Sequence, residues 1–249
     1  MLIQPTIDGL KTLKLFGMLK ALESQMEIPD SKALSFEERL GLLVDSELTA
    51  RENRRLHARL RTAKLPQLAT IDDIDLRGNR GIDRAELASL ASSDWIAKKQ
   101  NIIIMGPTGV GKSHLACALA EKACRDGYTV HFDKASRMFQ ELAVARADGT
   151  YTKRLEAIAR KDLLVVDDFG LFPLTEEQRQ DLLEITDDRY SNRSTMITTQ
   201  LPIDHWHEVI GEPTIADAIL DRVVHNSHKL RLKGESRRKD KTAGMQLVG

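Results

Sequence analysis

The eight residues from Gly106 to Ser113 have the types and spacing needed to bind a chain of phosphates. They read GPTGVGKS, which matches the pattern G-x-x-x-x-G-K-[ST]. The glycines let the backbone curl so that its N–H groups point at the phosphates, and the following helix aims its positive end at the same anion. Lys112 would supply a cation for the β- and γ-phosphates, and Ser113 a hydroxyl for Mg²⁺. We predict a nucleotide site with these ligands: Gly106, Pro107, Thr108, Gly109, Val110, Gly111, Lys112, Ser113 and His114.

A second chemical signal is the run LLVVDD, in which four apolar residues end in two acids, Asp167 and Asp168. The pattern is typical of a central strand that delivers a carboxylate beside the phosphate-binding loop. We expect Asp167 to hold Mg²⁺, through water, and Asp168 to orient the attacking water. Without the phosphate loop, a strand followed by an acidic turn would be the simpler interpretation.

A third, weaker signal is the segment MITTQLP at 196–202, which reads as a strand ending in polar residues. A polar side chain at that end could touch the γ-phosphate or position water. From the residues alone, a capped strand end explains the segment about equally well.

The elements around these motifs indicate an α/β fold. Short apolar runs alternate with helical stretches, which predicts a parallel sheet covered by helices on both faces. The expected strands are 101–105, 129–132, 163–167 and 194–199, with 230–232 as a candidate fifth.

The first part of the chain follows a different, helical pattern. Ser35 and Glu38 fit a capping box, and an apolar stripe at helical spacing follows them. We therefore expect a small all-helical N-terminal domain at 1–65 before the nucleotide-binding domain at 66–249. Within the latter, 66–94 reads as a junction rich in helix breakers and 229–249 as a basic tail.

The composition of the chain indicates the cellular compartment in which the protein is expected to work. Lys and Arg number 37, as do Asp and Glu, and the 249 residues include two cysteines. No apolar run approaches the roughly 18 residues needed to cross a bilayer, and the N-terminus does not resemble a signal peptide. Few cysteines suit a reducing compartment. We expect a cytoplasmic protein without a membrane partner.

One cationic stretch is a candidate surface for nucleic acid. Its charges recur near helical spacing, so they could track a phosphate backbone, although such runs are more often only solvated faces. Aromatic residues make up 4% of the chain and none interleaves with the stretch, which favours backbone contact with duplex DNA over base stacking. The residues are Arg51, Arg54, Arg55, Arg59, Arg61 and Lys64.

With these motifs in order, the chain resembles the IstB family of ATP-binding helper proteins of bacterial insertion-sequence transposition. That family is related to DnaC-type helicase loaders within the AAA+ ATPases. The resemblance spans nearly the whole chain and rests on the segments LKLFGMLKAL, RGIDRAELASLASSDWI, GPTGVGKSHLACAL, DLLVVDDFG, ITTQLP and AILDRVVHNSHKLRLKGESRRK. It implies an AAA+ core that hydrolyses ATP with Mg²⁺, binds ATP between subunits of a homo-oligomer and assembles on target DNA.

The same resemblance suggests two further catalytic positions beside Lys112 and Asp168. It places Gln200 at the sensor position and Arg222 at the arginine finger, which acts on ATP held by a neighbouring subunit. Many AAA+ proteins carry Glu where this chain has Asp168, so basal hydrolysis is expected to be slow. We expect the usual helical lid after the core to be missing.

Three functions compete at this stage. The first is a DNA-binding ATPase that assists a transposase; because the chain contains nothing like a nuclease motif of its own, the transposase would be a separate protein. The second is a DnaC-like helicase loader, which shares the core motifs. The third is a small-molecule kinase, which would need an acceptor site and a lid, and the sequence shows a signature of neither.

Overall fold

The computed structural model describes residues 3–28, 34–76 and 81–234. The chain divides into two compact units, Met1–Ala58 and Arg59–Gly249, and the division falls inside helix α3 (Phe36–Ala63). In the described part of the chain, no helix is both long enough and apolar enough to cross a membrane.

The N-terminal unit is helical, as expected, and contains α1 (Gln4–Thr12), α2 (Phe16–Glu27) and most of α3. The capping box before α3 is confirmed, because Glu38 N–H donates to Ser35 Oγ and Ser35 N–H donates to Glu38 Oε2. Helix α2 packs closely on α3 at Gly17, where a Cβ atom would lie 2.5 Å from the Ser46 carbonyl oxygen. The buried carboxylate of Glu47 accepts the Gly17 N–H at 2.7 Å. This contact joins the start of α2 to the middle of α3.

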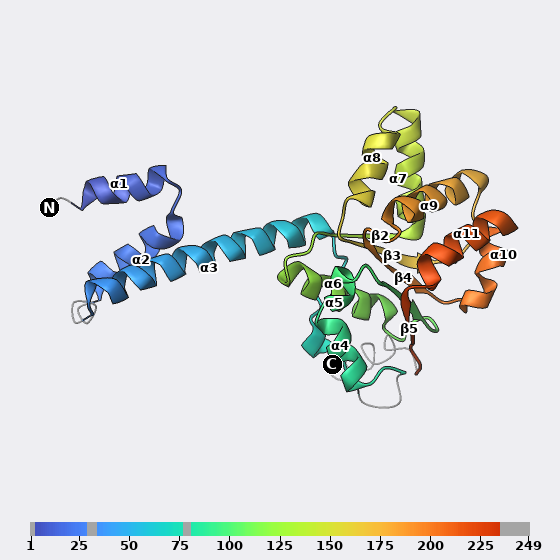
Figure 1. Cartoon of the computed structure of the whole chain (residues 1–249), viewed down its shortest axis with the longest axis horizontal. Helices are drawn as coiled ribbons and strands as arrows, with labels where there is room; N and C mark the ends of the chain where they lie inside the picture. Colours follow the sequence, from blue (N-terminus) through green and yellow to red (C-terminus); the bar gives the residue numbers. More distant parts are fainter. Residues whose placement is uncertain (1–2, 29–33, 77–80, 235–249) are drawn as a thin grey trace, which may run out of the picture. The chain divides into compact units, whose positions relative to one another are not determined.

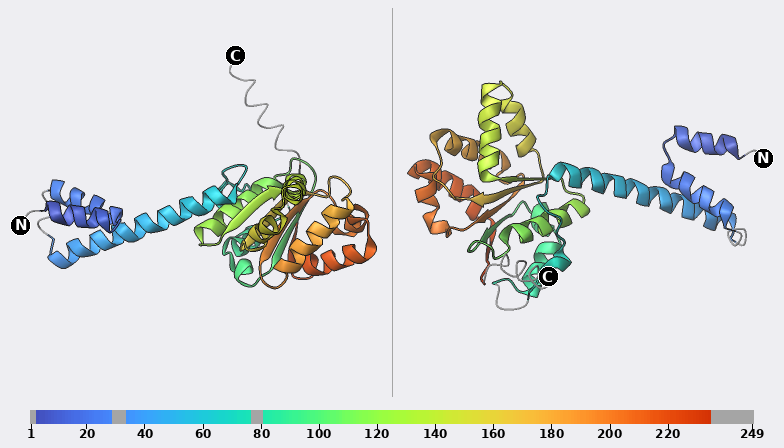
Figure 2. Two further views of the ribbon diagram at one scale, coloured as in Figure 1. Left: turned by 90° about the horizontal axis from the view of Figure 1, so that it is seen from above. Right: turned by 180° about the vertical axis from the view of Figure 1, so that it is seen from behind.

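The second unit contains a five-stranded, all-parallel sheet in the order β2-β3-β4-β1-β5. Its strands are drawn as arrows in Figures 1 and 2. This topology confirms the predicted α/β class and the five expected strands. The last strand begins earlier than the sequence pattern suggested, at Ser227. The bounds are β1 (Asn101–Met105), β2 (Val130–Lys134), β3 (Leu163–Phe169), β4 (Ser194–Thr199) and β5 (Ser227–Arg231).

Helices cover the sheet on both faces. On one face α6 packs against β1 to β4, and α4 and the 3-10 turn η2 pack against α6. The other face carries the larger apolar core, in which Ile103, Leu164, Val166 and Ile197 project from alternate strand positions. The helices not yet given are η2 (Ile71–Asp73), α4 (Arg84–Ala91), α5 (Asp94–Ala97), α6 (Lys112–Arg125), α7 (Ala135–Ala147), α8 (Tyr151–Ala159), α9 (Glu176–Arg189), η3 (Ile203–His205), α10 (Trp206–Ile210) and α11 (Pro213–Val224).

Two edges of this sheet matter for function. Because all strands are parallel, their carboxyl ends meet at one edge and their amino ends at the other. The segments that follow β1, β3 and β4 therefore converge at the carboxyl edge, where ligands of open α/β sheets usually bind. These segments are the ones that carry the predicted chemistry.

Candidate nucleotide-binding site

The phosphate-binding loop connects β1 to α6, as its sequence predicts. Gly106 has φ +150° and Gly111 has φ +102°, conformations that side-chain-bearing residues rarely adopt. A Cβ atom on Gly106 would also lie 2.5 Å from the Leu232 carbonyl oxygen, so glycine is required there by close approach as well. Helix α6 begins at Lys112, directly after the loop. Its N-terminal N–H groups therefore belong to the site.

Lys112 lies across the loop. Its side chain is buried, and Nζ donates to the carbonyl oxygens of Gly106 and Pro107, both at 2.9 Å. The ammonium is thus held over the concave side of the loop by backbone acceptors. A charge in this position can neutralise the β- and γ-phosphates of a bound nucleotide.

Asp167 forms the centre of a hydroxyl and carboxylate cluster. Its buried Oδ1 accepts hydrogen bonds from Ser113 Oγ at 2.8 Å and from Thr198 Oγ1 at 2.6 Å. Oxygen donors of this kind suit Mg²⁺, which commonly takes one or two protein ligands and completes its shell with water and substrate phosphates. Among the described residues no group of three potential metal-binding side chains occurs. Ser113 and Asp167 offer two oxygen ligands of the kind that Mg²⁺ takes from a protein.

Asp168 has an unusual backbone conformation. The pairing of β3 with β4 shifts between Val166 and Phe169, and Asp168 has φ +57°. Such bulges re-aim a side chain and are frequent beside active sites. The Asp168 N–H donates to Thr198 Oγ1 at 3.0 Å, and Oδ2 lies 3.3 Å from Lys134 Nζ. The second acid therefore stands at the edge of the site in a fixed orientation.

Gln200 reaches the loop from the end of β4. Its Oε1 accepts a hydrogen bond from Thr108 Oγ1 at 2.7 Å, and its side chain is exposed. The structure thus brings the third, weaker motif into contact with the first.

Arg222 lies far from the loop of its own chain. Its backbone carbonyl oxygen accepts a hydrogen bond from the side chain of Asn101, the first residue of β1. The phosphate-binding loop follows the last residue of the same strand. Five strand residues span roughly 16 Å, so its guanidinium does not reach the same nucleotide site. In the isolated chain, Nε donates to Asp187 and Nη1 donates to the Ala218 carbonyl oxygen at 2.7 Å.

The cationic stretch of 51–64 lies mostly on α3, and its members have different partners. Arg51 and Arg54 both contact Glu47, at 2.7 and 3.4 Å. Arg59 Nε donates at 2.7 Å to the carbonyl oxygen of Cys124 near the end of α6, which gives it a structural role. Three members are exposed and have no carboxylate within 4 Å among the described residues: Arg55, Arg61 and Lys64.

The sequence did not predict several residues of the site. Thr198 belongs to the polar strand end at 196–202, but no sequence feature distinguishes it from its neighbours. Lys134 ends a strand and belongs to no motif. A small hollow beside the loop joins segments distant in sequence, which no local pattern reveals; it is lined by Ile74, Asp75, Ile82, Val110, Gly111, His114, Leu115 and Leu232.

Comparison with known proteins agrees with this geometry. The model of the family described as IstB-like ATP binding protein matches residues 8–244. The chain belongs to this family. An insertion-sequence ATP-binding protein of Sinorhizobium fredii is 51% identical over 240 residues, covering 96% of this chain and 98% of the relative. A Mycobacterium tuberculosis ATP-binding protein in an insertion sequence is 34% identical, covering 95% of each chain.

Solved structures share the fold of this IstB-like chain. The DnaC helicase loader superposes with a TM-score of 0.56 at 24% identity, covering 66% of this chain and 97% of the loader. DnaA from Aquifex aeolicus bound to AMPPCP gives 0.57 at 17% identity, covering 74% of this chain and 55% of DnaA. The nucleotide-binding unit thus has the same fold as these two proteins, and its family is that of the IstB-like ATP binding proteins.

Proposed function

We propose that this IstB-like protein hydrolyses ATP, binds duplex DNA and assists a separate transposase. The observation that carries the proposal is the division of its catalytic groups between two edges of one sheet. Lys112, Ser113 and Asp167 converge at the carboxyl edge, whereas Arg222 lies near the amino edge. A second copy of the chain would have to supply the missing arginine.

At the carboxyl edge, each residue has a distinct task. Lys112 neutralises phosphate charge, and Ser113 and Asp167 would hold Mg²⁺, whose chemistry is to offset charge on the β- and γ-phosphates. Asp168 orients the attacking water and accepts its proton, while Gln200 faces the terminal phosphate from the end of β4.

At the amino edge, Arg222 acts on ATP bound by a neighbouring subunit. A guanidinium is permanently charged and can form two parallel hydrogen bonds to phosphate oxygens. Because the finger and the loop of one chain are separated, a monomer has an incomplete site. ATP then stabilises a homo-oligomer by lying between its subunits.

Duplex DNA and the transposase are the remaining partners of the proposal. The named relatives are proteins of insertion sequences, which points to a role in moving DNA. The exposed cations Arg55, Arg61 and Lys64 are suited to phosphate contacts that carry little sequence preference. The fold shared with the DnaC loader leaves a role in helicase loading as the alternative, but the closely similar proteins favour the first function. An adjacent transposase gene would support it, and a primosome gene would support the alternative.

The decisive experiment measures phosphate release from ATP with and without duplex DNA. We expect duplex DNA to accelerate turnover of the wild-type chain, and Lys112→Ala and Arg222→Ala each to be nearly inactive. A mixture of the two variants should regain activity, because one interface then pairs an intact loop with an intact finger. Arg160→Ala, which changes an exposed arginine directly after α8, is the matched control and should retain full activity.

The mixture must be shown to contain mixed oligomers, for example by co-purification of differently tagged chains. If mixed oligomers form and stay inactive, Arg222 does not complete the ATP site of a neighbouring subunit. Transfer of phosphate to a small molecule would instead identify a kinase.

A further inference from the structure

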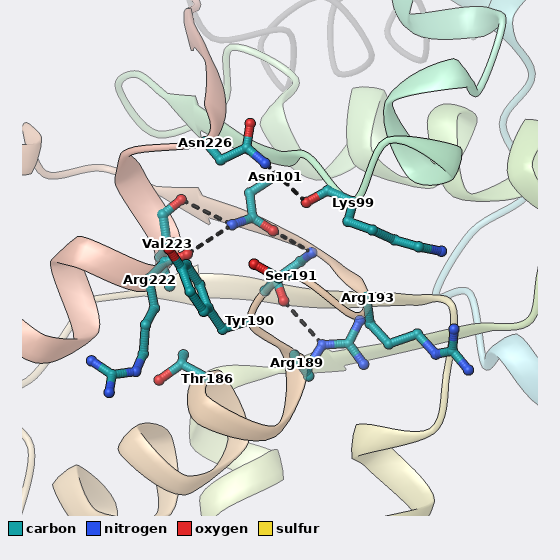
Figure 3. A pocket seen from close by; sticks show the side chains of 11 residues that line it. Lys99, Asn101, Thr186, Arg189, Tyr190, Ser191, Arg193, Arg222, Val223 and Asn226 are labelled. Carbon is teal, nitrogen blue, oxygen red and sulfur yellow. Dashed lines mark hydrogen bonds between the residues drawn. The ribbon is translucent and has the colours of Figure 1, made fainter.

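The first residue of β1 is a buried asparagine, Asn101, that is hydrogen-bonded to the helix carrying Arg222. Asn101 Nδ2 donates to the carbonyl oxygens of Arg222 at 3.2 Å and Val223 at 3.1 Å, and Oδ1 accepts the Thr195 N–H at 2.8 Å (Figure 3). Only 6% of its surface is exposed. Both amide hydrogens and the amide oxygen are therefore used in holding α11, β1 and β4 together.

The two carbonyl groups belong to the last turn of α11, which ends at Val224. Carbonyls in the last turn of a helix have no partner within the helix and normally bond to water or a cap. Here the side-chain amide of Asn101, on strand β1, donates hydrogen bonds to them instead. The backbone of Arg222 is thereby attached to the sheet, while Nε and Nη1 of its side chain are held by Asp187 and Ala218.

The same asparagine lines a cavity of about 50 Å³ at the amino edge of the sheet (Figure 3). A space of this size holds a few water-sized groups and excludes a nucleoside. Four cations and no acidic residue line it: Lys99, Arg189, Arg193 and Arg222. Two of these cations are ion-paired with acids outside the lining, Arg193 with Asp162 at 3.7 Å and Arg222 with Asp187. The lining residues themselves are therefore suited to a small anion only through the charge that Lys99 and Arg189 add.

Arg189 adds to the positive character of this cavity. It is 1% exposed and donates to the hydroxyl of Thr195 and to backbone carbonyl oxygens, including that of Lys161 at 2.8 Å. Within the described part of the chain, no carboxylate lies within 4 Å of it. Asp162, which pairs with Arg193, stabilises the charge of Arg189 only from a distance, so an approaching anion would add to that stabilisation.

We propose that Asn101 is the positioning residue for the arginine finger, so that strand β1 connects two ATP sites. At its carboxyl end β1 leads into the phosphate-binding loop of its own subunit. At its amino end Asn101 fixes Arg222, which serves the ATP of the neighbouring subunit. This inference rests on the proposed action of Arg222 between subunits, and it assigns to Asn101 a role in the neighbour's reaction.

The sharpest variant is Asn101→Asp, which has almost the same shape. It can keep the acceptor for Thr195 N–H, but it loses both donors and places an oxygen against the two carbonyl groups of α11. A displacement of about 1 Å can lower a rate by roughly 100-fold, so we expect kcat to fall by about 10- to 100-fold. The affinity of the isolated chain for ATP should not change, because the loop is intact. Asn192→Asp makes the same change at an exposed position outside the cavity and should match wild type.

Mixing experiments separate this role from a general structural one. Asn101→Asp mixed with Lys112→Ala should regain activity, because the Lys112 variant supplies an intact finger to the intact loop of the other chain. The ATPase activity of Asn101→Asp mixed with Arg222→Ala should stay low, because neither chain then supplies a fully working finger. The opposite result, rescue by Arg222→Ala and none by Lys112→Ala, would show that Asn101 serves the loop of its own subunit and would overturn the proposal.

Two further results separate the positioning role from the proposed function. If Asn101→Asp turns over ATP at the wild-type rate while the mixture of Arg222→Ala with Lys112→Ala regains activity, Asn101 does not position the finger. If the mixture of Arg222→Ala with Lys112→Ala stays inactive, the proposed function is refuted, and the role of Asn101 with it. If Asn101→Asp does not fold, Asn101→Ser repeats the test, because it removes the amide donors without placing a carboxylate oxygen against the two carbonyl groups. It should lower kcat as well.

Discussion

At the scale of single residues, the hydroxyl of Thr198 connects the two acids of the site. It donates to Asp167 Oδ1 and accepts the backbone N–H of Asp168. One small side chain thus holds the proposed metal-binding carboxylate and the proposed catalytic residue in fixed relation. The nearby Lys134 pairs with Asp168 and offsets its charge at the rim of the site.

Lys112→Ala should abolish tight ATP binding. The change removes the ammonium that the loop carbonyls hold, together with its charged hydrogen bonds to phosphate. Each such bond contributes about 1.5–3 kcal/mol, so the Kd for ATP should rise by roughly 100-fold or more. Titration with a fluorescent ATP analogue measures this, with Lys122→Ala on the same helix as control. An unchanged Kd would mean that the loop does not bind the phosphates.

Asp168→Asn should separate binding from turnover. The amide cannot accept the proton of the attacking water, so phosphate release should fall by about 10²- to 10⁴-fold while the Kd for ATP stays near wild type. Asp204→Asn, at an exposed position, controls for the loss of a carboxylate. Wild-type turnover by the Asp168 variant would exclude this residue as the catalytic base.

At the scale of elements, one carboxylate organises the helical N-terminal unit. Glu47 on α3 accepts the backbone N–H groups of Gly17 and Met18, and it pairs with Arg51. The hydrogen bond from Arg51 and those backbone donors hold its pKa below the ordinary glutamate value, although burial opposes them. The start of α2 is therefore stabilised by the ionised form of Glu47.

This arrangement makes the N-terminal unit sensitive to acid. Because the folded-state pKa of Glu47 is depressed, its stabilising effect is complete above the unfolded-state pKa of about 4.3 and is lost as pH falls through the folded-state value. Thermal melts followed by circular dichroism should show that Glu47→Gln lowers helix stability at neutral pH. Acid should then destabilise that variant less than wild type over this window. Glu37→Gln, on the exposed first turn of α3, should behave like wild type in both respects.

At the scale of the whole molecule, function is expected to require more than one chain and a length of DNA. Each chain contributes a loop to one proposed ATP site and a finger to another, so assembly and turnover depend on each other. The exposed cations around α3 offer phosphate contacts, and phosphate contacts supply affinity that depends on salt rather than on base sequence.

DNA binding should weaken with salt and with loss of these cations. Each phosphate contact contributes roughly 0.9 to the slope of log affinity against log salt concentration. Arg55→Ala combined with Arg61→Ala should therefore weaken binding to all duplexes alike and lower that slope by up to about two units. Fluorescence anisotropy at several salt concentrations measures both effects, with Arg160→Ala as control. A loss confined to one DNA sequence would contradict backbone contact.

The sequence by itself determined the features that depend on neighbouring residues. The phosphate loop needs eight consecutive residues, the strands are continuous apolar runs, and the capping box of Ser35 and Glu38 spans one helical turn. Local backbone geometry and hydrophobic pattern are enough to predict these.

Only the tertiary structure decided how these parts meet. Asn101 and Arg222 are 121 residues apart in the chain, and Thr198 and Asp167 are 31 apart, yet each pair is hydrogen-bonded. These contacts depend on the order of strands in the sheet and on the bulge at Asp168, which no local pattern specifies. Arg59, one charge among several in the sequence, became a structural residue because α3 brings it to the end of α6. The physical reason is that a side chain's role is set by the groups it can reach, and folding chooses those groups from distant parts of the chain.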